Sequence, residues 1–236
     1  MGEDTKRNVA VIIPAKNEEA RIAGVLRAAI GCRLATEVIV VDDGSDDRTS
    51  SVASKFPNVR VVRLPVNRGK AAAMCEGAKA TKAGILAFVD ADLGGLRSEH
   101  LDRIIAPLLA DECEMCVGIF RGGKVLSSAA QGVAPYLSGQ RAVKRELFEA
   151  VPNVADLGLG VEVALNRTAK KRKARIMRVK LHGVSNCYKE KKLGLVEGTK
   201  ARLQMWGEIS QAMRKNPKRR RLFHDRYGRW RWPNGR

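Results

Sequence analysis

Residues 9–19 read VAVIIPAKNEE, and residues 37–47 read EVIVVDDGSDD. Each stretch contains a continuous apolar run that changes abruptly to polar and acidic residues. A short, continuously apolar run is typical of a strand buried on both faces of a parallel sheet. The two stretches therefore predict parallel strands at 9–13 and 37–41, each followed at its carboxyl end by a polar loop.

The chain around these strands alternates helix and strand patterns. Helical spacing of apolar residues favours a helix at 18–30, and similar patterns predict helices at 48–56 and 70–80. Further strands are expected at 59–64 and 85–89. A β-α-β-α-β-α-β order predicts an α/β fold, with a mostly parallel sheet and helices on both faces.

The second half of the chain is less regular. Its patterns predict a helix around 101–108, a strand at 115–120, helices at 141–150 and 160–170, a strand at 174–181 and an amphipathic helix at 199–214.

Charge is distributed unevenly along the 236 residues, whose formal net charge is +19. Residues 1–163 carry 21 basic and 21 acidic side chains, whereas residues 164–236 carry 23 basic and 4 acidic ones. The 44% hydrophobic content excludes disorder of the whole chain. A neutral folded body followed by a basic segment is therefore expected.

The five cysteines are scattered and odd in number, and the N-terminus lacks an apolar leader. Both features favour a reduced, cytoplasmic protein. Cys113 and Cys116 form a single CxxC motif, which we interpret as part of a core strand, with a redox or metal role as the alternative. No apolar run approaches the roughly 20 residues that span a bilayer.

A D-A-D motif follows the predicted strand at 85–89. Asp90 and Asp92 stand two positions apart at a strand end, so both can reach one hard cation that also bridges the oxygens of a diphosphate. Ligands of open α/β sheets bind at this carboxyl edge. The motif indicates a Mg²⁺ or Mn²⁺ site, with solvated turn acids as the alternative.

Four motifs occur in order along the first half: PAKNEE at 14–19, DDGSDDRT at 42–49, NRGK at 67–70 and DADL at 90–93. Together they resemble the nucleotide-sugar-binding half of the GT-A glycosyltransferases, especially the family 2 type. The resemblance extends over roughly residues 8–190. It implies a GT-A (Rossmann-like) fold and metal-dependent transfer of a hexose from a nucleotide diphosphate sugar.

The resemblance also implies roles for individual residues. Glu18 would accept hydrogen bonds from ribose hydroxyls, Asp43 would accept the imide proton of a uracil-type base, and Lys70 would lie near the base or the diphosphate. Asp90 would approach the ribose or the sugar, and Asp92 would bind the metal. The other substrate-binding residues expected in these motifs are Pro14, Ala15, Asn17, Gly69 and Ala91.

For Asp42 and Asp46 we prefer a structural role, as N-terminal caps of the helix that begins near Arg48.

Two stretches of the second half, LSGQRA at 137–142 and GLGVEVAL at 158–165, are similar to glucosyl-3-phosphoglycerate synthases. This similarity implies substrate contacts for Gly139, Gln140 and Arg141. The sequence GGKV at 122–125 looks like the acceptor loop of that family. Lys124 would then meet the phosphate or carboxylate of an anionic acceptor, the alternative being an ordinary surface lysine.

Glu162 is predicted to begin a helix that faces the crevice. In the relatives this glutamate lies near the transferred sugar, so we expect a contact to a sugar hydroxyl or to the acceptor. In an inverting enzyme it would instead be the general base that deprotonates the acceptor. The alternative is an acid favoured at this position by the helix dipole.

Two departures from the synthases concern the metal and the acceptor. The relatives carry a metal-binding histidine after the strand that ends here at Leu181, and the closest register puts Asn186 in its place. His182 stands four residues earlier and would serve only if the loop were displaced. Leu126 occupies a position where the synthases have a hydroxyl near the acceptor, so the identity of the acceptor stays open.

The last third of the chain combines cations with aromatic side chains. Five of the eleven aromatics lie within 200–236, among arginines and lysines. This composition suits anionic lipid headgroups or nucleic acid. The alternative is a solvated tail that packs its tryptophans on the body or on a second subunit, as in a homodimer.

We expect a GT-A domain over 1–198, with a nucleotide-sugar-binding half at 1–95 and an acceptor half at 96–198. A basic aromatic helix and tail would occupy 199–236. The leading hypothesis is transfer of glucose from UDP-glucose to a phosphate-bearing acceptor resembling phosphoglycerate, with GDP-mannose as the second donor.

Two other functions stay open. The first is a polyprenyl- or dolichol-phosphate sugar synthase, held peripherally at the inner face of the membrane through 199–236. The second is an adaptor for lipid or nucleic acid whose transferase site has degraded at Asn186.

Overall fold

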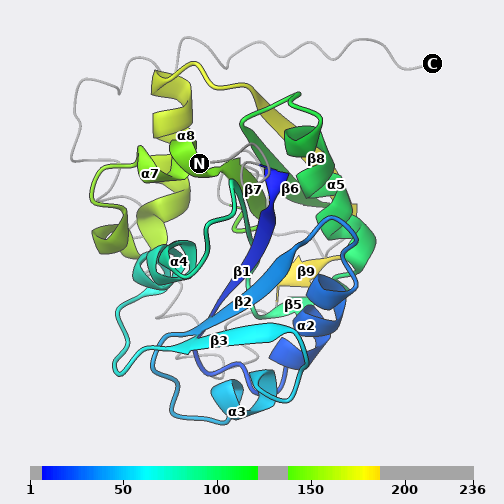
Figure 1. The fold of residues 1–236 in the computed structure, drawn as a ribbon, viewed down its shortest axis with the longest axis vertical. Coiled ribbons are helices and arrows are strands. Elements are labelled where there is room, and N and C mark those ends of the chain that lie inside the picture. The colour runs from blue at the N-terminus through cyan, green and yellow to red at the C-terminus, as the bar shows by residue number, and fades with distance from the viewer. Residues whose placement is uncertain (1–6, 122–137, 187–236) are drawn as a thin grey trace.

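The computed structural model describes residues 7–121 and 138–186 (Figure 1). Within these ranges the main sheet has seven strands in the order β3-β2-β1-β4-β7-β6-β8. The strands are β1 (Val9–Ala15), β2 (Glu37–Asp42), β3 (Val59–Arg63), β4 (Ile85–Phe88), β6 (Met115–Arg121), β7 (Arg141–Lys144) and β8 (Ile176–His182). A two-stranded sheet pairs β5 (Leu93–Gly94) with β9 (Ser185–Asn186).

The helices follow the alternation that the sequence predicts. They are α2 (Ile22–Ile30), α3 (Thr49–Ala53), α4 (Lys70–Lys79), α5 (Ser98–Leu109), α7 (Arg145–Glu149) and α8 (Val161–Lys171), with a 3₁₀ segment, η2 (Val154–Gly160), before α8. α2 begins at Ile22 rather than at residue 18 because the backbone from Glu18 to Arg21 forms a turn, closed by the Arg21 N–H donating to the Glu18 carbonyl at 2.9 Å.

The central strands are buried on both faces, as their apolar runs predict. β1 pairs in parallel with β2 and with β4, and β2 pairs in parallel with β3. Every residue of β4 is buried, and so is each residue of β1 except the half-buried Pro14. These parallel strands end at one edge of the sheet, where their polar loops lie together.

β7 is the element that the sequence patterns assigned wrongly. We expected a helix over 141–150, but Arg141–Lys144 form a strand and only Arg145–Glu149 are helical. β7 runs antiparallel between β4 and β6, with Arg141 opposite Phe88 on one side and Val117 on the other. The four residues are too few to show a strand period, and their strand conformation depends on pairing with two distant strands.

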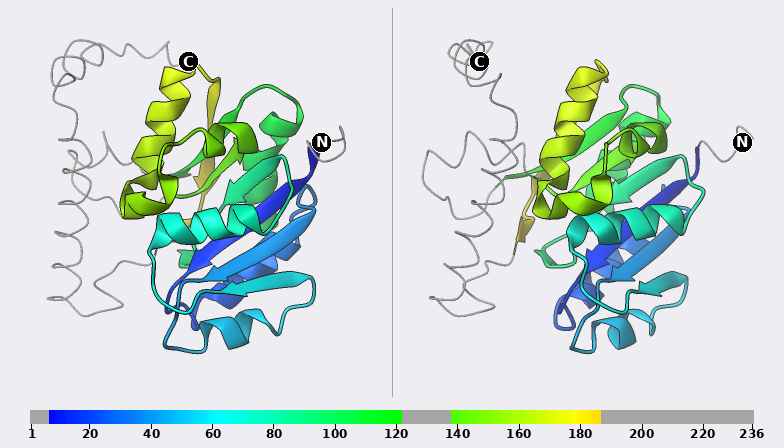
Figure 2. Two further views of the ribbon diagram at one scale, coloured as in Figure 1. Left: turned by 60° about the vertical axis from the view of Figure 1, so that its left-hand side comes forward. Right: turned by 90° about the vertical axis from the view of Figure 1, so that its left-hand side faces the viewer.

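Two helical layers cover the sheet (Figures 1 and 2). α2, α3 and α5 lie against one face, and α4, α7 and α8 lie against the other. Each layer closes its own apolar cluster, which contains Leu26 and Ile105 on the first face and Met74 and Leu165 on the second. The arrangement is the three-layer α/β architecture expected from the alternating elements.

The cysteines of the CxxC motif lie in the core. Cys113 and Cys116 are fully buried at the start of β6, within the cluster that contains α2 and α5. Burial of both thiols agrees with the core-strand interpretation.

Three further expectations concern the domain limits, the C-terminal helix and membrane spans. The domain limits at residues 95 and 198 stay a prediction, as does the helix at 199–214, which lies outside the described residues. No helix within the described ranges is long and apolar enough to cross a membrane.

Two mid-helix glycines provide a matched test of this packing. A Cβ on Gly77 in α4 would lie 2.4 Å from Cγ2 of Ile12, whereas a Cβ on Gly24 in α2 would meet no atom within 4 Å. We expect Gly77→Ala to lower the free energy of unfolding by about 1–3 kcal/mol through overpacking. Gly24→Ala should raise it by about 0.5–1 kcal/mol through helix propensity. Urea denaturation of both variants measures the difference, and equal effects would contradict the close contact of α4 with β1.

Candidate active site

The site lies at the carboxyl edge of the sheet and begins with the loop after β2. The Asp43 carboxylate is buried and accepts the backbone N–H groups of Arg68 at 2.7 Å and Gly69 at 2.8 Å. Gly44 has a φ of +64°, and a Cβ there would lie 2.8 Å from the Asn67 nitrogen. The Asp-Gly pair therefore holds the 67–69 loop close to β2 and sets the start of α4 at Lys70.

The loops after β1 and β2 are joined by their polar groups. The Asn17 N–H donates to Oγ of Ser45, and Oδ1 of Asn17 accepts the Asp46 N–H, both at 3.0 Å. Nζ of Lys16 lies 3.0 Å from Oδ2 of Asp46. The N–H of Glu18 donates to Oγ1 of Thr49 at 2.7 Å. Hydrogen bonds and an ion pair thus connect the PAKNEE motif to the DDGSDDRT motif.

The expected helix capping by Asp42 and Asp46 is wrong. Asp42 instead accepts the Ser45 N–H at 3.0 Å within the loop, and Asp46 faces Lys16. The carboxylate that accepts the Thr49 N–H, at 2.9 Å, is Asp47. Asp47 stands two residues before Thr49, the first residue of α3, and its carboxylate therefore supplies this bond.

Lys70 lies at the centre of the candidate site, between two carboxylates. Its Nζ is 2.6 Å from Oδ1 of Asp90, which follows β4, and 2.7 Å from Oε1 of Glu162, in the first turn of α8. Glu162 is 92 positions from Lys70 in sequence. Motifs separated along the chain thus meet as a single cluster.

These contacts perturb the protonation of the cluster. Burial by itself would lower the pKa of Lys70, but the neighbouring charges of Asp90 and Glu162 outweigh it and raise that pKa above the usual lysine range. Burial would raise the pKa of Asp90, but Lys70 and the hydrogen bonds to this carboxylate lower it. The lysine and Asp90 are therefore charged together at neutral pH.

The segment before β7 completes the cluster. Nε2 of Gln140 donates to Oδ2 of Asp90 at 2.6 Å, and Oγ of Ser138 donates to Oε1 of Gln140 at 3.0 Å. A Cβ on Gly139 would lie 2.4 Å from Oδ2 of Asp90 and 2.7 Å from Nζ of Lys70. The glycine is required because the backbone passes directly over the ion pair.

Arg141 is fully buried behind this segment, on the side of the sheet that carries α8. Nη2 donates to the Ser138 carbonyl at 2.5 Å, and Nη1 lies 3.4 Å from both the Glu162 carbonyl and Oδ1 of Asn166. Burial lowers the pKa of Arg141, while the charges of Glu162 and Asp90 act in the opposite direction.

The remaining predicted residues differ in how closely they join this cluster. Glu18 is buried and lies 3.5 Å from Nη1 of Arg21. Asp92 is half-buried, two residues after Asp90. Pro14 and Ala15 end β1, and Ala91 is buried between the two aspartates. Lys124 and Leu126 lie outside the described residues.

The metal ligands predicted from the sequence are gathered only in part. Asp90 and Asp92 supply the carboxylate oxygens that Mg²⁺ and Mn²⁺ prefer, but Asp90 already bonds Lys70 and Gln140. His182 is exposed at the end of β8, opposite Arg121. Within the described residues no group of three His, Cys, Asp or Glu is close enough to hold a metal, so His182 does not join the two aspartates.

The backbone of Asn186 does lie next to the D-A-D motif. β9 pairs with β5 so that Asn186 is opposite Leu93, the residue after Asp92. Asn186 is therefore near the D-A-D motif along the backbone, and its correspondence to the relatives' metal-binding histidine stays a prediction.

Sequence reasoning missed Asn166 as a neighbour of the cluster. Asn166 stands four residues after Glu162, one turn along α8, and this spacing is the signal that could have pointed to it.

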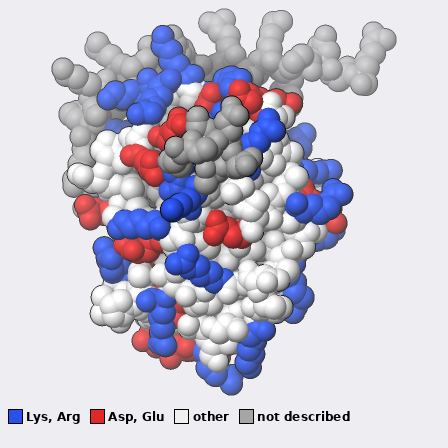
Figure 3. Space-filling view, viewed as in Figure 1, with Lys and Arg blue, Asp and Glu red and all other residues white. Residues whose placement is uncertain are grey.

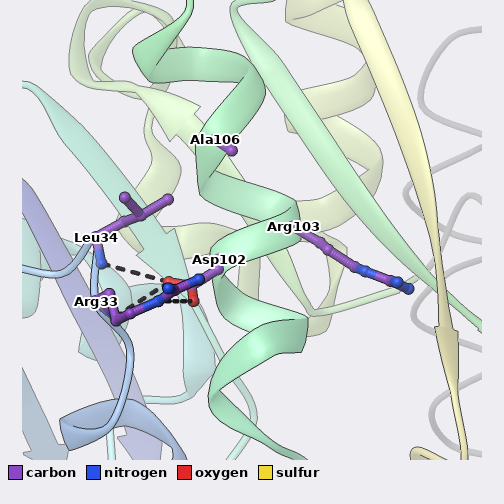
Figure 4. Close-up of a pocket in the computed structure, with 5 residues that line it drawn as sticks. All are labelled: Arg33, Leu34, Asp102, Arg103 and Ala106. Atoms are coloured by element: carbon purple, nitrogen blue, oxygen red, sulfur yellow. Dashed lines mark hydrogen bonds and ion pairs between the residues drawn. The ribbon is translucent and has the colours of Figure 1, made fainter.

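A pocket away from this cluster lies between the loop after α2 and α5 (Figure 4). The Asp102 carboxylate on α5 accepts the N–H groups of Arg33 at 3.1 Å and Leu34 at 3.3 Å. It also accepts the thiol of Cys32 at 3.2 Å. These bonds tie the loop after α2 to α5, and none of the lining residues belongs to the cluster around Lys70.

The comparisons with known proteins agree with this geometry. Residues 10–150 match the sequence profile of Glycosyl transferase family 2, which covers more than half of the chain. The chain therefore belongs to glycosyltransferase family 2.

Relatives within this family include the glucosyl-3-phosphoglycerate synthase of Mycobacterium tuberculosis (strain ATCC 25618 / H37Rv). It is 30% identical over 196 residues, which cover 67% of this chain and 60% of the relative. The dolichyl-phosphate beta-glucosyltransferase of Mus musculus is 36% identical over 101 residues, 36% of this chain and 31% of the relative. The chain thus spans about 60% of the length of the synthases.

A solved structure confirms the GT-A fold. The Mycobacterium tuberculosis synthase in complex with Mn²⁺, uridine-diphosphate and glucosyl-3-phosphoglycerate superposes with a TM-score of 0.72 and 27% identity. The match covers 89% of this chain and 79% of that one.

Replacing Lys70 should destabilise the protein, because two carboxylates would lose their neighbouring cation. We expect Lys70→Met to lower the free energy of unfolding by about 3 kcal/mol at pH 7, because it leaves the half-buried Asp90 and the buried Glu162 without their cation. A lowered folded-state pKa of Asp90 stabilises the protein above the unfolded pKa of about 4 and is lost as the pH falls further. The difference from the wild type should therefore shrink below about pH 4.

Chemical denaturation from pH 3 to pH 8 measures this effect. Lys79→Met is the control, because Lys79 is an exposed lysine of the same helix that pairs with Glu76. A pH-independent loss in Lys70→Met would contradict the ion-pair account.

Proposed function

We propose that this protein transfers a hexose, glucose first, from a nucleotide diphosphate sugar to a phosphate-bearing acceptor with the help of Mg²⁺ or Mn²⁺. UDP-glucose is the first donor and GDP-mannose the second. The observation that carries the proposal is the contact of Lys70 with Asp90 and Glu162. Such a largely buried group of opposite charges at the ligand edge of an α/β sheet is typical of a substrate site.

The donor would occupy the edge formed by the loops after β1, β2 and β4. Pro14, Ala15, Asn17 and Glu18 would line the base and ribose pocket, with Asp43 at the base. Each oxygen of Asp43 holds a backbone N–H and keeps a second lone pair for a base N–H.

The diphosphate would lie near Lys70, Gly69 and Asp92. Asp92 would hold the metal, which when bound neutralises charge on the departing diphosphate. Lys70 already contacts two carboxylates. Its ammonium group would therefore also contact the diphosphate only when a donor is bound.

Glu162 would contact the transferred sugar or the acceptor. It is 6% exposed and begins α8 at the cluster. In an inverting reaction it would accept the proton of the acceptor hydroxyl. Gly139, Gln140 and Arg141 would shape the same side of the site, and Lys124 would meet the anionic group of the acceptor.

A small acceptor resembling phosphoglycerate is the first choice. The similarity of residues 137–142 and 158–165 to glucosyl-3-phosphoglycerate synthases supports it, together with the relative whose solved complex contains glucosyl-3-phosphoglycerate. Such an acceptor fits a cytoplasmic location, which we propose for the chain.

A polyprenyl phosphate at the membrane is the second choice, and a surface feature favours it. Lys170, Lys171, Arg172 and Lys173 are exposed at the end of α8, and Arg178 and Lys180 are exposed on β8. Figure 3 shows blue side chains over the end of α8, at the top of the molecule. Exposed cations of this kind attract anionic lipid headgroups. The name of the Mus musculus relative, dolichyl-phosphate beta-glucosyltransferase, includes a lipid phosphate.

The role of residues 199–236 belongs to the same proposal. The segment would contact the inner face of the membrane or pack against a second subunit. The adaptor function without catalysis is the third choice, and it predicts no nucleotide-sugar binding at all.

A product assay tests the proposal. The protein is incubated with Mn²⁺, with UDP-glucose or GDP-mannose as donor, and with 3-phosphoglycerate or a polyprenyl phosphate as acceptor. The products are identified by mass spectrometry. The expected product carries one added hexose on 3-phosphoglycerate. Transfer only to the lipid phosphate would select the second choice, and no binding of UDP or GDP by calorimetry would overturn the enzyme function.

Glu162 should matter for turnover more than for folding. We expect Glu162→Gln to lower kcat by roughly 100-fold, within the usual range for a lost general base, while UDP affinity stays within about twofold because the base pocket is intact. The matched control is Glu146→Gln, since Glu146 is also an acid in the first turn of a helix but is exposed on α7. Equal losses in both variants would support the helix-dipole interpretation instead.

Asp92 should determine the metal requirement. We expect Asp92→Ala to raise the Mn²⁺ concentration for half-maximal UDP binding at least about tenfold, as for a lost ligand oxygen. Asp111→Ala is the control, because Asp111 is an exposed aspartate that pairs with Lys144. Calorimetry with UDP across a Mn²⁺ series measures the shift, and unchanged Mn²⁺ dependence would remove Asp92 from the metal site.

A further inference from the structure

Arg141 has an environment that ordinary sheet packing does not explain. Its side chain has no solvent exposure, although the strand it begins is otherwise apolar on that face, where Val143 joins the core. No carboxylate lies within ion-pair distance of it among the described residues, and its Nε has no hydrogen-bond partner there. A buried arginine in this state costs stability, so a hydrophobic side chain would serve the sheet better.

The three contacts of this arginine connect two pieces of the candidate site. One nitrogen donates to the Ser138 carbonyl, two residues before Gln140, which orients Asp90. The other approaches the Glu162 carbonyl and the Asn166 side chain on α8. A planar guanidinium can hold both pieces at a fixed separation, which a lysine cannot do.

We propose that Arg141 is a positioning residue that fastens the first turn of α8, and with it Glu162, to the segment that carries Gln140. In doing so it sets the distance between Glu162 and Asp90, the two carboxylates that share Lys70. The inference rests on the proposed function, because Glu162 is the residue assigned there to the sugar or acceptor.

The charges of the site support this role. Glu162 is a buried anion and Asp90 a half-buried one, and Lys70 is the cation that touches both. Arg141 adds a second positive charge behind Glu162, so the four groups are neutral together. A donor that drew Lys70 toward its diphosphate would leave Arg141 in place behind the carboxylates, with its positive charge beside Glu162.

Arg145 provides a matched comparison within the same segment. It donates to three backbone carbonyls, those of Ala78, Thr81 and Ala83, at 2.7–3.1 Å, whereas Arg141 donates to two carbonyls and one side-chain oxygen. These groups lie at the end of α4 and in the loop before β4, whereas Asp90 follows the other end of β4. Arg145 thus also joins separate backbone segments, with an added ion pair to Glu149 at 3.2 Å, and the part of the fold that it joins contains none of the proposed substrate groups.

The experiment uses the full chain with Arg141→Lys and Arg145→Lys. Hydrogen exchange of the amides at 161–165 is measured without ligand, and the Kd values of UDP-glucose and UDP are measured with Mn²⁺ by calorimetry. Arg141→Lys should speed exchange in the first turn of α8 by tenfold or more. It should also raise the ratio of the UDP-glucose Kd to the UDP Kd by about tenfold, because the sugar loses its positioned partner while the base pocket is unchanged.

Arg145→Lys should lower the melting temperature and leave both the exchange at 161–165 and the Kd ratio unchanged. Asn166→Ala is a milder variant in case Arg141→Lys does not fold, and it should shift exchange and ratio in the same direction by a smaller factor.

The outcomes separate the two proposals. Wild-type exchange and an unchanged ratio in Arg141→Lys would overturn the positioning role, and so would equal shifts in Arg145→Lys. A wild-type protein that binds neither UDP nor UDP-glucose would overturn the proposed donor, while the exchange measurement would still decide whether Arg141 fastens α8.

Discussion

The pairing of β7 with β4 joins the two halves of the sheet. β3, β2, β1 and β4 come from the first part of the chain, β6 and β8 from the second, and β7 lies between them with hydrogen bonds to both sides. Because β7 is antiparallel to β4, the residues before Arg141 run alongside the carboxyl end of β4. Gly139 and Gln140 are thereby delivered to Asp90.

Electrostatics then dictates how the site is built around that junction. Two carboxylates in a poorly hydrated pocket repel each other and are costly to bury, so both need a cation. Lys70 supplies it, and it can do so because the bonds from Asp43 to the 67–69 loop set where α4 begins. The absence of a side chain at Gly139 leaves room for the lysine and Asp90 to approach each other.

Much of the fold could be predicted from local patterns. The apolar runs of β1, β2 and β4 are strong signals because strands covered on both faces need apolar residues at every position. The 141–150 segment was misassigned for the opposite reason, since four residues carry no period and Arg141 looks polar. Similarly, Asp42 and Asp46 resembled caps because the sequence does not reveal how tightly the loop folds before α3.

The residue types of the site were visible in the sequence, but their contacts were not. PAKNEE, DDGSDD and the D-A-D motif could be assigned to the sheet edge, because loops after parallel strands share an edge. The joint contact of Lys70 with Asp90 and Glu162 could not be anticipated from spacing, since Glu162 reaches the cluster on a helix from a distant part of the chain. Asn166 and the fully buried state of Arg141 likewise appear only once α8 packs against β7.

By itself, the sequence determined the family of this chain, the alternation of parallel strands and helices in its first half and the chemical character of its ligand edge. These properties depend on short segments whose burial pattern and loop chemistry are local. The tertiary structure decided which charges meet, because ion pairs and hydrogen bonds act over a few ångströms and depend on the register between distant elements. It also decided that Arg141 lies behind Glu162, since that position follows from the insertion of β7 between β4 and β6.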